Sequence, residues 1–135
     1  MVISKKILLV DDEAGIRSLL FEALSEKGFE VTLAKDGKDS LDQMKNDHFD
    51  LLITDMHMPR LDGVGLLKEM KKSGRKEKVI IMTGRPEDVT LRKKDVPPVL
   101  TQLHKPFQIG SLLDVVSSAL AEPAKKRRKK KAVSA

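Results

Sequence analysis

The sequence contains no cysteine, no tryptophan and no tyrosine. The absence of cysteine excludes disulfides and thiolate metal sites, and it fits a reducing cytoplasm. Long hydrophobic runs are also missing, because the apolar run that follows Lys5 and Lys6 spans only four residues. That run is too short for a signal peptide or a membrane span. We therefore expect a soluble, cytoplasmic protein with no transmembrane segment.

The main part of the chain lacks an excess of positive charge, although the formal net charge is +6. Seven of the 26 basic residues form the run Lys125–Lys131, which leaves 19 basic against 20 acidic residues elsewhere. The run follows Pro123 and has no apolar periodicity, which predicts a disordered basic tail over residues 123–135. Residues 1–122 are enough for one folded domain.

The basic tail has several candidate partners. Its cations can neutralise the phosphates of nucleic acid, bind an anionic membrane surface, or meet an acidic patch on a partner protein. No aromatic residue interleaves the run, so any binding to nucleic acid should be independent of sequence. A tail that only improves solubility would have no partner at all. The sequence leaves these alternatives open.

Apolar runs alternate with helical patterns along the chain and predict an α/β fold. The predicted strands are Ile7–Val10, Phe29–Ala34, Leu51–Asp55, Val79–Met82 and Val99–Leu103. Helices are expected over 13–27, 37–46, 64–74 and 109–120, and a more polar one after Pro86 that ends before Pro97. Five strands alternating with five helices predict a doubly wound parallel sheet with right-handed crossovers.

Polar side chains follow four of these predicted strands. Asp11 and Asp12 follow the first strand, Asp55 ends the third, Thr83 follows the fourth, and Lys105 comes shortly after the fifth. Because the carboxyl ends of parallel strands meet at one edge of a sheet, we expect these side chains to lie together.

The three carboxylates in this set would repel one another unless a cation lay between them. Mg²⁺ resolves the conflict, since it takes carboxylate oxygens and leaves room for a phosphate. Lys105 then supplies positive charge to a phosphoryl oxygen, and Thr83 supplies a hydroxyl donor. Asp55 is the candidate nucleophile, which would form an aspartyl phosphate.

Four spaced motifs resemble the receiver domain of two-component response regulators, over residues 5 to about 121. They are the pair Asp11-Asp12, the pattern D-x-x-M-P-x-x-D-G from Asp55, T-G at Thr83, and K-P-F at Lys105. The resemblance implies a flavodoxin-like sheet with strand order 2-1-3-4-5. It also implies that Asp55 is the phosphoacceptor, and that Asp11 and Asp12 hold Mg²⁺ together with Asp55 and the backbone carbonyl of His57. Thr83 and Lys105 would then contact the phosphoryl group, and a cis peptide would precede Pro106.

The resemblance further implies a single-domain switch rather than an enzyme. A sensor histidine kinase or phosphotransfer protein would donate the phosphoryl group, and a downstream protein would recognise the change. The only catalysis expected is slow self-phosphorylation and hydrolysis of the acyl phosphate. The alternative hypothesis is a phosphorelay carrier, or a platform tethered to nucleic acid or membrane by Lys125–Lys131.

One position departs from the family pattern. The family usually has an aromatic residue three positions before the lysine, and Gln102 stands there. By the same resemblance, His57 and Arg85 adjust how fast water reaches the acyl phosphate.

Each candidate residue also has a structural explanation when it is considered alone. Asp11 or Asp12 can cap a helix, Thr83 can cap the helix after it, and Lys105 can be an ordinary surface lysine. Asp62-Gly63 indicates a turn pair whose glycine tolerates a positive φ. A haloacid-dehalogenase phosphatase is disfavoured because His57 replaces the second acid. A dinucleotide-binding unit is disfavoured because the first turn is not glycine-rich.

Overall fold

Five parallel strands form one sheet in the computed structural model of the chain, which describes residues 4–85 and 91–121. The strand order is β2-β1-β3-β4-β5, as predicted. The strands are β1 (Lys6–Val10), β2 (Glu30–Ala34), β3 (Leu51–Asp55), β4 (Lys78–Thr83) and β5 (Val99–His104).

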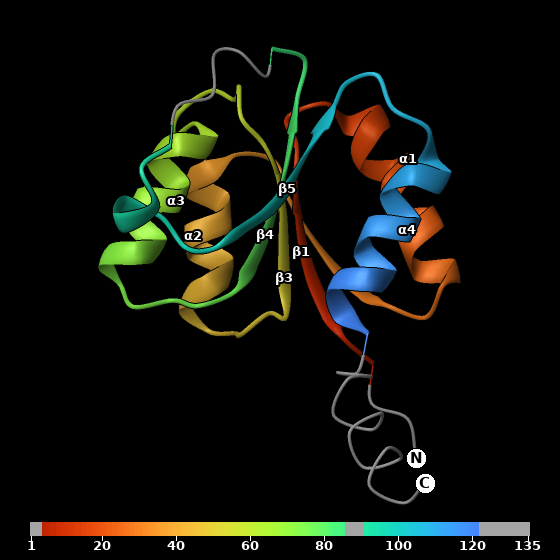
Figure 1. The fold of residues 1–135 in the computed structure, drawn as a ribbon, viewed down its shortest axis with the longest axis horizontal. Helices are drawn as coiled ribbons and strands as arrows, with labels where there is room; N and C mark the ends of the chain where they lie inside the picture. The colour runs from red at the N-terminus through yellow and green to blue at the C-terminus, as the bar shows by residue number, and fades with distance from the viewer. Residues whose placement is uncertain (1–3, 86–90, 122–135) are drawn as a thin grey trace, which may run out of the picture.

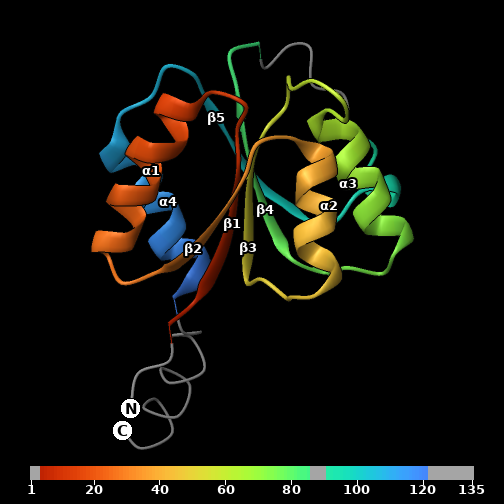
Figure 2. The ribbon, with the colours of Figure 1, turned by 180° about the vertical axis from the view of Figure 1, so that it is seen from behind.

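Helices cover both faces of the sheet. α1 and α4 lie on one face, and α2 and α3 lie on the other (Figures 1 and 2). Four predicted helices are present, with the bounds α1 (Ala14–Glu26), α2 (Gly37–Lys45), α3 (Gly63–Lys72) and α4 (Ile109–Leu120).

The fifth predicted helix has no α-helical counterpart in the described residues. Residues 86–90, where it was expected to begin, lie outside the described part of the chain. The described remainder holds a single turn of 3₁₀-helix, η2 (Lys93–Asp95). Val96 and then Pro97 and Pro98 follow this turn. A proline disfavours helical geometry in the residue before it.

The central strands are apolar on both faces because both faces are covered. Ile7 and Leu9 of β1 pack in the core that contains α1 and α4 residues, whereas Leu8 and Val10 pack in the core that contains α2 and α3 residues. All four side chains are fully buried. Burying each aliphatic side chain stabilises the fold by roughly 2 kcal/mol, so the unbroken apolar run is what a central parallel strand requires.

β5 forms one edge of the sheet and alternates half-buried with exposed residues. Leu100 is 45% exposed there. β2 forms the other edge, as the strand order 2-1-3-4-5 requires.

The parallel arrangement brings the ends of β1, β3, β4 and β5 to one edge of the sheet. Val10 pairs with Thr54, Asp55 with Met82, and Thr83 with His104. The residues chosen from the sequence for their chemistry therefore follow neighbouring strand ends.

Two predictions about the ends of the chain concern residues 122–135, outside the described part. The disordered tail and the domain boundary at residue 122 therefore stay predictions. Within residues 4–85 and 91–121, no helix is both long and apolar enough to cross a membrane.

Candidate functional site

Three carboxylates meet at the carboxyl-terminal edge of the sheet. Asp11, Asp12 and Asp55 each place one carboxylate oxygen within 4.8 Å of the others. Asp11 and Asp55 are buried, and Asp12 is exposed. The structure thus brings together the acid triplet chosen from the sequence, with one side open to solvent.

Lys105 lies among these acids. Its Nζ donates to Asp11 Oδ2 at 3.0 Å and to Asp55 Oδ2 at 3.3 Å. The backbone holds it there, because the Lys105 N–H donates to the Thr83 carbonyl at 2.7 Å. The bond between Lys105 and Pro106 is cis, as predicted. One ammonium group therefore partly offsets the charge of the two buried carboxylates.

Burial and charge shift the pKa values of this pair. Burial raises the pKa of the Asp55 carboxyl above its usual range, and the neighbouring Asp11 adds to the rise while Lys105 opposes it. Burial works to lower the pKa of Lys105, but its hydrogen bond to Asp11 and the charges of Asp11 and Asp55 outweigh burial and raise it. Lys105 therefore stays an ammonium group at neutral pH.

Hydrogen bonds fix the loop that carries Asp11. Asp11 Oδ1 accepts from the Glu13 N–H at 2.9 Å, and the Asp11 carbonyl accepts from Arg17 Nη1 at 2.7 Å. Arg17 was not among the site residues predicted from the sequence. The available signal was its position in the first turn of α1, because helical side chains lean toward the helix N-terminus.

Thr83 is buried at the end of β4, next to Met82, which pairs with Asp55. Its Oγ1 accepts from the Arg85 N–H at 3.0 Å. A hydroxyl that accepts one hydrogen bond still has its own O–H to donate. The side chain is therefore equipped to donate to an oxygen at this edge of the sheet.

His57 is exposed, two residues beyond Asp55. Its backbone N–H donates to Asp55 Oδ1 at 3.4 Å. The backbone around His57 is therefore close to the Asp55 carboxylate.

The Asp62-Gly63 pair differs from its prediction. Asp62 caps α3, with its side chain accepting from the Gly65 N–H at 2.9 Å. Gly63 is the first residue of α3 and is not among the positive-φ glycines, which are Gly28 and Gly74. A Cβ on Gly63 would lie 2.8 Å from the Asp55 carbonyl oxygen, so glycine is required here by close packing rather than by its φ angle.

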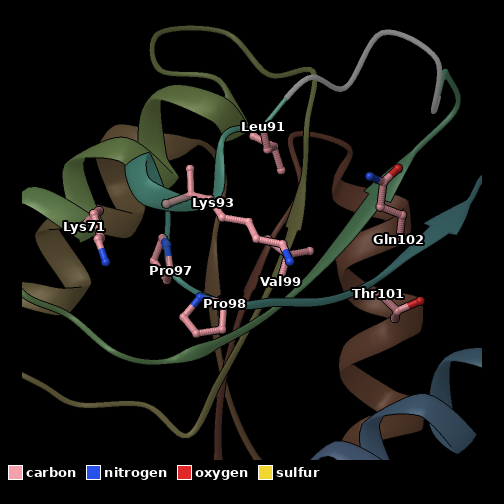
Figure 3. A pocket seen from close by; sticks show the side chains of 9 residues that line it. Lys71, Leu91, Lys93, Pro97, Pro98, Val99, Thr101 and Gln102 are labelled. Carbon is pink, nitrogen blue, oxygen red and sulfur yellow. The ribbon is translucent and has the colours of Figure 1, made fainter.

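Gln102, which replaces the usual aromatic residue, lies on the edge strand β5. It is exposed on β5 and lines a pocket of about 650 Å³ beside η2 and the end of α3 (Figure 3). The other residues that line this pocket are Lys71, Leu91, Lys93, Val96, Pro97, Pro98, Val99 and Thr101.

With this geometry in place, comparison with known proteins decides the family. The family model of the response regulator receiver domain matches residues 7–117. The chain belongs to the receiver domains of response regulators. The site at the strand ends is therefore the acidic pocket of a receiver domain.

Three relatives of this receiver domain show how far the similarity extends. Sporulation initiation phosphotransferase F of Bacillus subtilis is 36% identical over 119 residues, which cover 88% of this chain and 96% of that protein. Response regulator MprA of Mycobacterium bovis is 35% identical over 82% of this chain, which spans only about half (48%) of MprA. The structure of TrrA from Thermotoga maritima, in complex with Mg²⁺-BeF, has a TM-score of 0.73 and 32% identity, covering 86% of this chain and 99% of that one.

Proposed function

We propose that Asp55 of this receiver domain accepts a phosphoryl group from a sensor histidine kinase or a phosphotransfer protein. The observation that carries the proposal is the contact of Lys105 with both Asp11 and Asp55, at 3.0 and 3.3 Å. The proposal is supported because a buried carboxylate suited to act as nucleophile, a second carboxylate and a positive charge lie within contact of one another. Phosphoryl transfer requires little more than such positioning and charge.

The acid cluster fits a magnesium ion. Its three carboxylate oxygens lie within 4.8 Å of one another, and Mg²⁺ is bound in proteins through one or two carboxylates with several waters. Asp11, Asp12, Asp55 and the backbone carbonyl of His57 would hold it. When bound, Mg²⁺ would neutralise charge on the phosphoryl oxygens. The relative TrrA was crystallised with Mg²⁺-BeF, which supports this proposal.

The chain's own residues perform the transfer. An oxygen of the Asp55 carboxylate forms a bond to phosphorus while the bond from phosphorus to the donor's imidazole nitrogen breaks. The product is an acyl phosphate on Asp55. Lys105 and the Thr83 hydroxyl then contact the phosphoryl oxygens, and the receiver signals through altered binding to a downstream protein. Slow self-phosphorylation and hydrolysis of the acyl phosphate are the only reactions we expect.

Labelling with acetyl phosphate tests this function. In the presence of Mg²⁺ we expect one phosphoryl group per chain, labile to hydroxylamine and absent from Asp55→Asn. Asp42→Asn, which removes an exposed carboxylate on α2, is the matched control and should be labelled like the wild type. An unlabelled wild type, under conditions that label another receiver domain, would refute the proposal.

A second function, relay of the phosphoryl group to another protein, is favoured by the similarity to a phosphotransferase. The chain covers 96% of sporulation initiation phosphotransferase F. A carrier should pass its label to the histidine of a phosphotransfer protein from the same organism. Loss of the label only as inorganic phosphate would favour the switch over the carrier.

The basic run Lys125–Lys131 is the basis of a third, separate proposal. We propose that it tethers the receiver domain to nucleic acid or to an anionic membrane, within the cytoplasm. If all seven cations engage B-DNA, the affinity should fall with salt at a logarithmic slope of about −6. Deleting residues 125–135 should abolish this salt-sensitive binding and leave phosphorylation of Asp55 unchanged. Equal binding by the deletion variant would disprove the tether.

A further inference from the structure

A bidentate ion pair joins the loop after β3 to the start of α2. Arg60 Nε donates to Asp36 Oδ2 at 2.7 Å, and Arg60 Nη2 donates to Asp36 Oδ1 at 3.0 Å. The Asp36 side chain is only 5% exposed, although that of Arg60 is 53% exposed. Such paired N–H···O contacts fix the relative orientation of both groups, unlike a single-point ion pair.

The same carboxylate also caps α2. Asp36 Oδ1 accepts from the Asp39 N–H at 2.9 Å. The first turn of α2 therefore fixes the Asp36 carboxylate that binds Arg60. The pair is thus an attachment of the loop to a regular element of the fold.

Arg60 occupies a strained turn. The Leu61 N–H donates to the Pro59 carbonyl at 2.8 Å, and Arg60 between them has a φ of 66°. A three-residue turn with a positive central φ is rare and strained for a residue that has a Cβ. Strain of this kind persists only where the surrounding contacts overdetermine the conformation. Here the ion pair with Asp36 is such a contact.

Backbone contacts hold the same loop, residues 56–62, at its base and near Arg60. The Gly63 N–H donates to the Met56 carbonyl at 3.1 Å, and the Gly37 N–H donates to the Leu61 carbonyl at 3.1 Å. A Cβ on Gly37 would lie 2.3 Å from the Leu61 oxygen, so the loop and the start of α2 are in direct contact. The ion pair adds a side-chain attachment to this backbone contact.

This attachment joins two segments that each contact one of the buried acids. On one side, Met56 and His57 directly follow Asp55, and the His57 N–H donates to its carboxylate. On the other side, the Ala34 carbonyl accepts from the Asp11 N–H at 3.2 Å, two residues before Asp36. Hydrogen bonds and short stretches of backbone therefore link Asp11 to Asp55 by way of Ala34, Asp36 and Arg60.

We propose that Arg60 and Asp36 are positioning residues of the phosphoacceptor site. Their ion pair fixes the path of residues 56–62, and with it the backbone of His57 beside Asp55. Neither residue is a catalytic residue, because their contacts are with each other and with the backbone. The inference rests on the proposed Mg²⁺-dependent function, since Mg²⁺ is the group whose binding the loop would control.

Mg²⁺ affinity of the full chain, followed by NMR of the backbone amides, tests this role. Arg60→Gly removes the guanidinium and relieves the positive φ, so the fold should be retained. Asp36→Asn keeps a helix cap but loses the charge. We expect each variant to raise the Mg²⁺ dissociation constant about three- to tenfold, and the double variant to be no worse than either one.

Two further variants separate positioning from mere charge or stability. Arg60→Lys keeps the charge but not the bidentate contact. It should recover less than half of the Mg²⁺ affinity that Arg60→Gly loses. The control is Arg92→Gly, which breaks an exposed Arg–Asp pair in which Arg92 Nε lies 3.7 Å from Asp95 Oδ2. It should bind Mg²⁺ like the wild type.

The outcomes also distinguish this inference from the function on which it rests. If the wild type binds Mg²⁺, Asp55→Asn does not, and Arg60→Gly binds as tightly as the wild type, the positioning role is overturned and the proposed function survives. If amide signals of residues 56–62 shift in Arg60→Gly without a change in affinity, the pair is structural only. If the wild type itself fails to bind Mg²⁺, both proposals fail.

Discussion

The ammonium group of Lys105 lies 3.3 Å from the carboxylate of Asp55, although 50 residues separate them in the chain. The same Nζ lies 3.0 Å from Asp11 Oδ2. A positive charge is thus built into the protein between the two buried acids. This charge partly offsets their repulsion, and it also competes electrostatically with any added cation.

Replacing Lys105 with methionine should therefore have two opposite effects. Mg²⁺ should bind severalfold more tightly, because a neighbouring positive charge is removed. Phosphorylation of Asp55 should become slower by at least tenfold, because one contact to the phosphoryl oxygens is lost. NMR titration and acetyl phosphate labelling measure the two quantities. Lys71→Met, at an exposed position on α3, is the control, and weaker Mg²⁺ binding in Lys105→Met would contradict this account.

Asp55→Asn should be more stable than the wild type in the absence of Mg²⁺. The raised pKa of Asp55 shows that its burial disfavours the charged form, so the neutral amide removes a penalty at neutral pH. Mg²⁺ at tenfold above its dissociation constant should stabilise the wild type by about 1.4 kcal/mol. The gain should be much smaller in Asp55→Asn. Thermal unfolding with and without Mg²⁺ measures both differences, and an equal gain in the variant would rule out Asp55 as a ligand.

The Asp36–Arg60 pair predicts a pH dependence of stability. The hydrogen bond from Arg60 lowers the pKa of the Asp36 carboxyl, and this effect outweighs burial, which would raise the pKa. A lowered folded-state pKa gives stability that is fully present above the unfolded value, near 3.9, and is lost as the pH falls through the folded value. The wild type should therefore exceed Asp36→Asn in stability by a constant amount above about pH 5. That difference should shrink below about pH 4.

Urea unfolding at pH 7, 5 and 3.5 measures this difference. Asp42→Asn, also on α2, removes one acidic charge without touching Arg60 and serves as the control. If the difference in unfolding free energy between wild type and Asp36→Asn grows toward acid pH, the predicted direction of the pH dependence is wrong.

Glu77 should matter for stability but not for the site. Its carboxylate accepts from Arg75 Nε at 3.1 Å and from the Phe49 N–H at 3.3 Å. Glu77 directly precedes β4, so these contacts lie at the amino-terminal ends of the strands, opposite the acid cluster. Glu77→Ala leaves a largely buried guanidinium and an N–H without this acceptor, which should cost about 2–3 kcal/mol in urea unfolding. Mg²⁺ affinity at 25 °C should be unchanged. A large loss of affinity would show that the two edges are coupled.

Local patterns were sufficient to predict most of the fold. Ile7–Val10 and Val79–Met82 are apolar throughout, which is typical of strands covered on both faces, and Gly28 marks the end of α1. The segment after Pro86 was less informative. Its polar composition allowed a helix, but the described part forms only the 3₁₀ turn Lys93–Asp95.

The sequence by itself determined the strand and helix periods, and it placed Asp11, Asp55, Thr83 and Lys105 at strand ends. Because parallel strands all end at one edge, that placement already implied a shared site. Only the tertiary structure decided which of these side chains touch. Lys105 contacts Asp11 across 94 residues, and Asp36 holds Arg60 across 24. Contacts between loops depend on the path of each backbone in space, and no period in the sequence encodes that path.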